Sequence, residues 1–329
     1  MSKTSTDPVR HALNGPTMGT RWSALFHADA GLDPAPVQAA LQAAVADVDA
    51  LMSTWKPDSD LMRLNRTPEG VRVIVPARLA EVLDLGLRIG TASGGAFDIG
   101  MGDAARAWGF GSEPANAEAM RAAMATARRP AQEALEVDPL AGLARKHAPI
   151  ALDLNGIAKG HGVDRLAKTL QGFGITAFLV GIDGEMRASG LRPDGMPWTV
   201  AVEMPDPERR APHSILKLAD AAVATSGDYR HYVTLRGRRL SHTMDPTTGG
   251  PLRSSPASVT VVARTCAEAD AWATALMVLG PQAGGELASR LGLHALFLIR
   301  EAGVIRTHAV GALFDSPMVS AAGREGLVR

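Results

Sequence analysis

The chain contains 329 residues, 46% of them hydrophobic and 21% charged, and its 34 basic residues balance its 34 acidic residues. This composition is typical of a globular protein with a sizeable core, and without a basic excess it argues against a dedicated nucleic-acid-binding protein. The single cysteine, Cys266, excludes an internal disulfide, and with no base close to it in the sequence it is better explained as a core residue than as a nucleophile.

The first 15 residues are polar, contain no cysteine for lipid attachment and lack the apolar stretch of a signal peptide. We expect residues 1–15 to be disordered and residues 16–329 to form a single domain. The chain has no run of about 20 apolar residues, so no transmembrane segment is expected. The sequence as written indicates a cytoplasmic protein, and a periplasmic location would require that a leader had been removed.

The first half of the chain predicts two amphipathic helices among short strands. Asp33 before Pro34 is a helix start signal, and apolar residues then recur at helical spacing. The elements expected here are a strand at 18–28, a helix at about 34–54, a strand at 71–75, a helix ended by Gly94 and Gly95, and an exposed helix with loops at 111–135.

The second half alternates short apolar runs with two further helices. The strands expected are 150–154, 176–182, 198–203, 221–227, 231–237, 258–264, 294–300 and 303–309, and the helices are about 157–171 and 267–279. Many short strands mixed with about five helices predict an α+β (mixed α/β) fold, built in two halves with a cleft between them.

Asp270 and Thr274 stand four residues apart in the last predicted helix, so both lie on one helix face. A carboxylate and a hydroxyl are hard oxygen ligands of the kind that magnesium takes. The rest of the helix is apolar, so Asp270 is expected to be buried and to need a partner. The alternative, which the spacing alone favours, is an Asp near the helix start and a Thr that bonds its own backbone.

The segment 151–164 runs from a predicted strand through Gly156 into a helix. At such a junction the backbone N–H groups and the positive end of the helix face any bound anion. Lys159 would add a positive charge beside a phosphate, although the GxxxxGK[ST] spacing of a P-loop is absent. A plain strand–helix junction with a surface lysine explains the pattern equally well.

Two hydroxyl- or imidazole-bearing segments lie near turns. His242 precedes a loop rich in Pro and Gly at 245–250, where an imidazole could act as a base, but a lone loop histidine more often has no chemical role. Thr225 and Ser226 end an apolar strand, where ordinary turn chemistry is the simpler interpretation.

The Gly-rich stretch 94–103 would let a flat ligand approach the backbone closely. Asp98, directly after Phe97, could bond the polar edge of a ring, and Met18 and Trp55 could form apolar walls for an aromatic ligand. For each of these four side chains taken alone, a place in the core is the preferred explanation.

Seven sequence blocks, spread over almost the whole chain, occur in an order typical of one enzyme family. They are MGT (18–20), STWKPDSDLMRLN (53–65), FDIG (97–100), DLNGIAKGHGVD (153–164), VATSGDY (223–229), SHTMDPTTGGPL (241–252), and SVTV with ADAWATALMVLG (258–280). Together they resemble the ApbE family of FAD:protein FMN transferases. The DPTTGGP and ADAWATALMVLG blocks are the most specific.

The resemblance implies a T-fold-like ApbE architecture that holds its substrate FAD in a nucleotide cleft, with a magnesium ion on the FAD pyrophosphate. By motif position it places the metal ligands on the backbone oxygen of Gly156 and on the side chains of Asp270 and Thr274, and the catalytic role on His242. The implied flavin and adenine contacts are Met18, Trp55, Ala96, Phe97, Asp98, Lys159 and Thr243.

The sequence departs from the family pattern beside this expected cleft. Asp183-Gly184-Glu185 stands where the family has Gly-Gly-Asp, and His161 stands where the family has Tyr. Asp183 adds a negative charge close to where the nucleotide is expected.

The function that the resemblance implies is magnesium-dependent transfer of FMN from FAD to a Ser or Thr hydroxyl of an acceptor flavoprotein, with release of AMP. A magnesium-dependent FAD pyrophosphatase, which would admit water in place of the hydroxyl, is the nearest alternative. A non-catalytic FAD-binding or storage protein and a purely structural domain are alternatives of other classes, and both would leave Asp270, Thr274 and His242 without a role.

Overall fold

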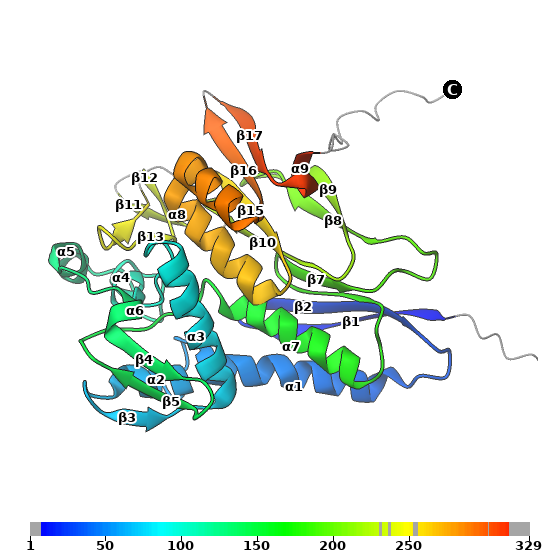
Figure 1. Cartoon of the computed structure of the whole chain (residues 1–329), viewed down its shortest axis with the longest axis horizontal. Helices are drawn as coiled ribbons and strands as arrows, with labels where there is room; N and C mark the ends of the chain where they lie inside the picture. Colours follow the sequence, from blue (N-terminus) through cyan, green and yellow to red (C-terminus); the bar gives the residue numbers. More distant parts are fainter. Residues whose placement is uncertain (1–7, 230–231, 236–237, 253–255, 302, 316–329) are drawn as a thin grey trace, which may run out of the picture.

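The computed structural model describes residues 8–229, 232–235, 238–252, 256–301 and 303–315. Its centre is an eight-stranded sheet in which each neighbouring pair is antiparallel, in the order β1-β2-β6-β7-β10-β15-β16-β17 (Figure 1). The strands are β1 (Val9–Thr17), β2 (Thr20–Ala28), β6 (Phe178–Ile182), β7 (Glu185–Ser189), β10 (Ala222–Gly227), β15 (Ser258–Ala263), β16 (His294–Glu301) and β17 (Val304–Val310).

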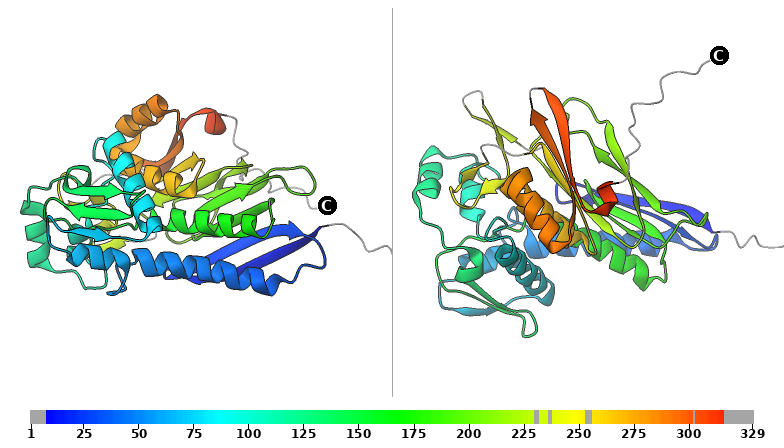
Figure 2. Two further views of the ribbon diagram at one scale, coloured as in Figure 1. Left: turned by 60° about the horizontal axis from the view of Figure 1, so that its bottom comes forward. Right: turned by 45° about the horizontal axis from the view of Figure 1, so that its top comes forward.

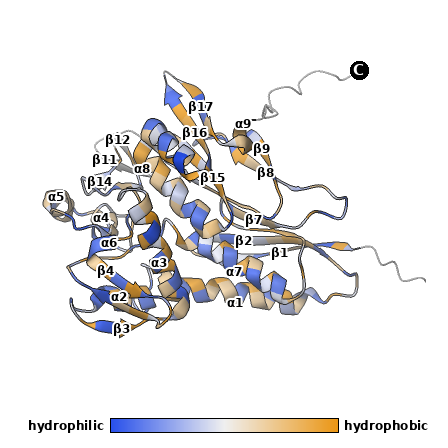
Figure 3. Cartoon of the chain, viewed as in Figure 1, coloured by the Kyte–Doolittle hydropathy of each residue, from blue (hydrophilic) through white to orange (hydrophobic). Residues whose placement is uncertain are grey.

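Helices cover one face of this sheet and a hairpin covers the other (Figures 1 and 2). The helices are α1 (Pro34–Met52), α7 (Ala158–Gly172) and α8 (Cys266–Leu291), and the hairpin is β8 (Trp198–Glu203) with β9 (Pro212–Leu218). Side chains alternate between the two cores along each strand, as in β16, where Phe297 packs towards α8 and Leu296 towards the hairpin. Figure 3 shows hydrophilic residues on the outward surface of α7.

The α1–α7 side of the sheet owes its stability to large apolar side chains. Trp22, Phe26 and Phe178 are fully buried there against Leu41 of α1 and Leu166 of α7. Burial of each of these side chains contributes about 1.5–3 kcal/mol to the free energy of unfolding.

A second group of elements lies beside α1 and α8. It contains α2 (Asp60–Arg66), α3 (Ala77–Ala92), α4 (Gly102–Ala107), α5 (Ala117–Ala125) and α6 (Ala131–Ala134), and the three-stranded sheet β3 (Arg72–Ile74), β5 (Leu143–Lys146), β4 (Leu135–Asp138). In this group α2 is in contact with α1, and α3 is in contact with α8. The two small strand pairs are β11 (Tyr232–Leu235) with β12 (Arg238–Ser241) and β13 (Met244–Asp245) with β14 (Gly250–Pro251), and α9 (Ala312–Asp315) follows β17.

The helix α8 is longer than the predicted 267–279. Thr265 and Glu268 form a reciprocal capping box at its start, and Gly292 ends it in the left-handed conformation. Gly280, at φ 76°, breaks the helical backbone directly before Pro281 and kinks the helix. Among the residues that the structure describes, none of the helices has the length and apolar character needed to cross a bilayer.

The interpretation of Cys266 as a core residue is confirmed. Its side chain is completely buried at the start of α8, and this burial raises the pKa of the thiol well above its usual range. A buried, protonated thiol is a poor nucleophile.

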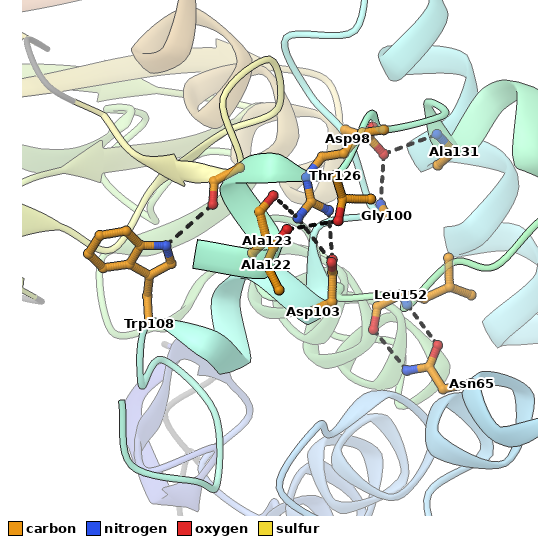
Figure 4. Close-up of polar contacts among 12 residues, drawn as sticks. Asn65, Asp98, Gly100, Asp103, Trp108, Ala122, Ala123, Thr126, Ala131 and Leu152 are labelled. Carbon is orange, nitrogen blue, oxygen red and sulfur yellow. Dashed lines mark hydrogen bonds and ion pairs between the residues drawn. The ribbon is translucent and has the colours of Figure 1, made fainter. Parts of the chain in front are cut away.

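Two predictions about the backbone were wrong. Residues 9–15, predicted to be disordered, belong to β1, which pairs with β2 along its whole length; residues 1–7 lie outside the described residues. The segment 150–154 is not a strand beyond one isolated bridge at Ala151. Its buried Leu152 instead exchanges backbone hydrogen bonds of 2.9 and 2.7 Å with the amide side chain of Asn65 (Figure 4).

The mixed α/β class is confirmed, while the nucleotide cleft between two halves stays a prediction. In the described part of the chain, α7 and α8 contact one another as well as the central sheet. At that contact the two helix backbones approach closely. A Cβ built on Gly160 of α7 would lie 2.8 Å from the Cα of Ala267 and 2.6 Å from the carbonyl carbon of Cys266.

Replacing Gly160 with Ala is therefore expected to lower stability by about 1–3 kcal/mol, the usual cost of overpacking. The matched control is Gly172→Ala at the end of the same helix, where a Cβ would meet nothing within 4 Å. Thermal denaturation of both variants measures the difference, and equal melting temperatures would show that the two helices can separate at no cost.

His161 lies on α7 beside Arg165, Arg78 and Asp47, and its Nε2 is buried without a hydrogen-bond partner. Burial, followed by repulsion from Arg165 and Arg78, lowers the pKa of His161 to about 4. In the unfolded chain His161 takes up a proton near pH 6.5, whereas in the folded protein it does so only at about pH 4. The native state therefore loses stability as the pH falls through this window.

His161→Gln removes this titration. The melting temperature of the parent protein should fall more steeply between pH 7 and pH 4.5 than that of the variant. Parallel curves over this range would contradict the assignment of a buried neutral imidazole.

Candidate active site

The three predicted metal ligands lie where α7 and α8 meet. Asp270 is 5% exposed, and its Oδ2 accepts the Gly160 N–H at 3.0 Å. One turn later, the Thr274 hydroxyl lies 3.1 Å from that of Ser226 at the end of β10. A Cβ on Gly156 would lie 3.2 Å from Thr274 Oγ1, so the loop before α7 lies against the same face of α8.

Lys159 lies beside these ligands among carboxylates. Its Nζ lies 2.7 Å from Glu185 Oε1 and 3.9 Å from Asp183 Oδ2. Burial acts to lower the pKa of Lys159, but attraction to Glu185, Asp270 and Asp183 outweighs it and raises the pKa. Lys159 therefore stays charged, already paired with a carboxylate that is itself almost fully buried.

The Asp270 carboxyl responds to the same cluster in the opposite sense. Burial foremost, followed by repulsion from Glu185, raises its pKa to about 7, against the attraction of Lys159 and the Gly160 N–H. A buried carboxyl group with such a raised pKa is only partly charged at neutral pH. A bound cation would stabilise its charged form.

The donor atoms at this place suit a hard cation. They are a carboxylate, a hydroxyl and a backbone carbonyl, on Asp270, Thr274 and Gly156. Within the described ranges, no group of three or more His, Cys, Asp and Glu side chains could hold a metal ion by itself. Mg²⁺ characteristically uses one or two carboxylates and completes its shell with substrate phosphates and water. The residues present therefore fit Mg²⁺ bound together with a phosphate ligand.

The two predicted apolar walls differ in exposure. Met18 and Gly19, at φ 45° and 71°, form the two-residue turn between β1 and β2. The Met18 Cε lies 3.3 Å from where a Cβ on Gly162 would be, so this turn packs against α7. Trp55, after α1, is 60% exposed and leaves a large aromatic surface open to solvent.

The predicted contacts at 96–98 have structural roles. Ala96 and Phe97 are buried, with the Phe97 ring 3.1 Å from a Cβ position on Gly156. Asp98 Oδ1 accepts N–H groups from Gly100 at 2.7 Å and Ala131 at 3.2 Å (Figure 4). Burial raises the pKa of Asp98 despite these two bonds. Its carboxylate shapes the loop beside Gly156, whatever it also does towards a ligand.

His242 and Thr243 lie on the connection from β12 to β13. The His242 ring makes an edge contact with Phe110, with the ring centres 6.3 Å apart. Thr243 is buried, and its carbonyl accepts the Leu252 N–H at 3.0 Å.

The loop after Thr243, which contains Gly249, packs against the α4–α5 region. Trp108 Nε1 donates to the Gly249 carbonyl at 3.3 Å, and Arg128 joins Asp103 and the Ala123 carbonyl (Figure 4). Gly249, at φ 64°, packs so closely on Ala123 that a side chain would collide with its carbonyl oxygen. These contacts fix the loop that follows His242.

Three residues that sequence reasoning did not assign to the site contribute to it. Ser226, explained there by turn chemistry, bonds Thr274. Glu185, the first residue of β7, is only 2% exposed and pairs with Lys159. Asp164 caps α8 by accepting the N–H groups of Cys266 and Ala267 at 2.9 and 3.0 Å. The sequence of β7, Glu-Met-Arg-Ala-Ser, has no apolar pattern that could have revealed Glu185.

Comparison with known proteins gives a consistent family. The ApbE family model matches residues 18–297. An FAD:protein FMN transferase of Klebsiella pneumoniae is 35% identical over 88% of this chain and 84% of its own length. One from Vibrio cholerae is 36% identical over 88% and 87%.

Solved structures agree with this sequence comparison. The flavin transferase ApbE of Vibrio cholerae matches with a TM-score of 0.81 at 33% identity, covering 92% of this chain and 97% of that one. The apo flavinyl transferase ApbE of Pseudomonas stutzeri also has a TM-score of 0.81, at 35% identity, over 92% and 95%. The family model alone spans well over half of the sequence, and this chain belongs to the ApbE family.

Proposed function

We propose that this protein is an FAD:protein FMN transferase, which moves the FMN part of FAD onto a Ser or Thr hydroxyl of an acceptor flavoprotein. The relatives named above support the activity. The observation that carries the proposal is the meeting of Gly156, Lys159, Asp270 and Thr274 at the α7–α8 contact. Hard oxygen donors and an ammonium group at one place suit a substrate diphosphate and its divalent cation.

The residues that would hold Mg²⁺ are Asp270 and Thr274 through their side chains and Gly156 through its backbone oxygen. When bound, the ion would neutralise charge that builds up on the diphosphate during displacement at phosphorus. Met18, Trp55, Thr243 and residues 96–98 would contact the flavin and adenine parts. Of these, Trp55 offers the largest open aromatic surface for ring stacking.

The transfer is a displacement at the phosphorus on the FMN side of FAD. The acceptor hydroxyl oxygen forms a bond to this phosphorus, the bond from the phosphorus to the bridging oxygen breaks, and AMP leaves with that oxygen. His242 accepts the hydroxyl proton, a role that suits an imidazole near neutral pH. Phe110 lies edge-on to its ring.

The names of the relatives favour transfer over the two alternatives considered from sequence. A pyrophosphatase would deliver FMN and AMP to solvent, and a storage protein would need no base beside its ligand. The Klebsiella and Vibrio relatives are both named as transferases.

Transfer should depend on the divalent cation. The purified protein, mixed with FAD, Mg²⁺ and an acceptor domain carrying a Ser/Thr flavinylation motif, is expected to add a covalent FMN mass to the acceptor, and EDTA should abolish the addition. Asp270→Asn should raise the Mg²⁺ concentration for half-maximal rate by about tenfold or more. The matched control, Glu286→Gln at an exposed position in the second half of α8, should leave this concentration unchanged.

Intact mass spectrometry of the acceptor is the measurement. FMN and AMP released without acceptor modification would support the pyrophosphatase. FAD that stays intact with several acceptors would support the storage protein.

His242→Ala should slow transfer by about 10²- to 10⁴-fold, the usual contribution of a general base, while FAD binding is preserved. His147→Ala is the control, because His147 is exposed and pairs with Glu136 on another sheet. Single-turnover transfer and FAD titration are measured in parallel. An unchanged transfer rate in His242→Ala would remove this residue from the chemistry.

A further inference from the structure

One ammonium group is shared among several carboxylates at the candidate site. Lys159 pairs with Glu185 at 2.7 Å, and Asp183 approaches the same Nζ to 3.9 Å. The Glu185 side chain is 3% exposed and forms the inner partner, with its Oε2 buried and without a hydrogen bond. The Lys159 and Asp183 side chains are 30% and 32% exposed and form the outer part of the cluster.

Asp183 is held in place by its backbone. It occupies the two-residue turn between β6 and β7, where Ile182 pairs with Glu185. Its φ of 56° lies in the left-handed region, which glycine adopts freely and a side chain disfavours. The carboxylate is therefore carried by a position whose backbone would suit glycine, directly beside Lys159.

The charges of this cluster oppose a free diphosphate. Lys159 contributes one positive charge, whereas Asp183, Glu185 and Asp270 contribute up to three negative charges. A diphosphate diester such as that of FAD carries two negative charges, and a bound divalent cation cancels both. Repulsion between like charges a few ångströms apart is strong at a partly buried site. The Asp183 carboxylate therefore repels the metal-free diphosphate far more than the neutral complex of the diphosphate with a divalent cation.

We propose that Asp183 is a specificity-determining residue that makes this site bind a nucleotide diphosphate as its divalent-cation complex and disfavour the metal-free dianion. The inference rests on the proposed function, because it takes the FAD diphosphate to lie beside Lys159. Asp183 achieves this selectivity through fixed charge at the outer side of the Lys159–Glu185 pair.

The test is equilibrium binding of FAD, followed by quenching of flavin fluorescence, in EDTA and in saturating Mg²⁺. In EDTA, Asp183→Asn should bind FAD about five- to tenfold more tightly than the parent protein, and added salt should shrink this gap. In Mg²⁺ the two affinities should agree within about twofold. Asn tolerates the left-handed conformation, so this variant changes the charge and keeps the turn.

Two controls separate charge from backbone effects. Asp220→Asn is matched, because Asp220 also has a positive φ, of 52°, but accepts the Gly190 N–H away from Lys159; it should leave both affinities unchanged. Asp183→Gly should gain as much affinity in EDTA as Asp183→Asn. Riboflavin, which lacks the diphosphate, should bind the parent protein and both Asp183 variants alike.

The proposal would be overturned if Asp183→Asn and the parent protein bound FAD with equal affinity in EDTA. It would also be overturned if only Asp183→Gly bound FAD more tightly, or if Asp183→Asn gained as much FAD affinity in Mg²⁺ as in EDTA. Failure of the parent protein to bind FAD even with Mg²⁺ would instead overturn the proposed function itself. FAD binding by the parent protein in Mg²⁺ is therefore enough to distinguish the two failures.

Discussion

The structure depends above all on the contact of two helix backbones at Gly160. Because no side chain separates α7 from α8 there, the Gly160 N–H can bond the buried Asp270 carboxylate. Asp164, one turn later, bonds the first N–H groups of α8. These links fix α7 and α8 both along and around their axes, and they bring Gly156 against Thr274. The candidate site exists because this contact is so close.

The charges around this contact form a connected set rather than separate pairs. Arg187 bonds Asp164 at 2.6 Å, while Lys159 serves Glu185 and also attracts Asp270 and Asp183. Breaking a buried pair by removing one partner costs more than the pair itself contributes. The strand β7 therefore matters to the site although it carries no proposed ligand, since Glu185 and Arg187 both lie on it.

Local patterns allowed the main helices and strands to be predicted, because their signals lie within a few residues. The Asp33 cap and the spacing of four between Asp270 and Thr274 are examples. The strand predicted at 150–154 failed because an apolar run does not reveal what bonds its backbone, and here Asn65, 87 residues away, does so. The partner of Lys159 was equally out of reach, since strand pairing alone brings Glu185 to it. The order of motif blocks, rather than any single block, identified the family.

The kink at Gly280 and Pro281 divides α8 mechanically. Proline has no N–H to continue the ladder of helical hydrogen bonds, and Gly280 is not helical. The half that carries Asp270 and Thr274 is embedded between α7, β10 and β15, whereas the half after the kink faces β17 at the edge of the sheet. The two halves of α8 can therefore take different directions, so the inner half keeps Asp270 and Thr274 beside α7 while the outer half lays Gly284 and Gly285 against Phe297 and His308.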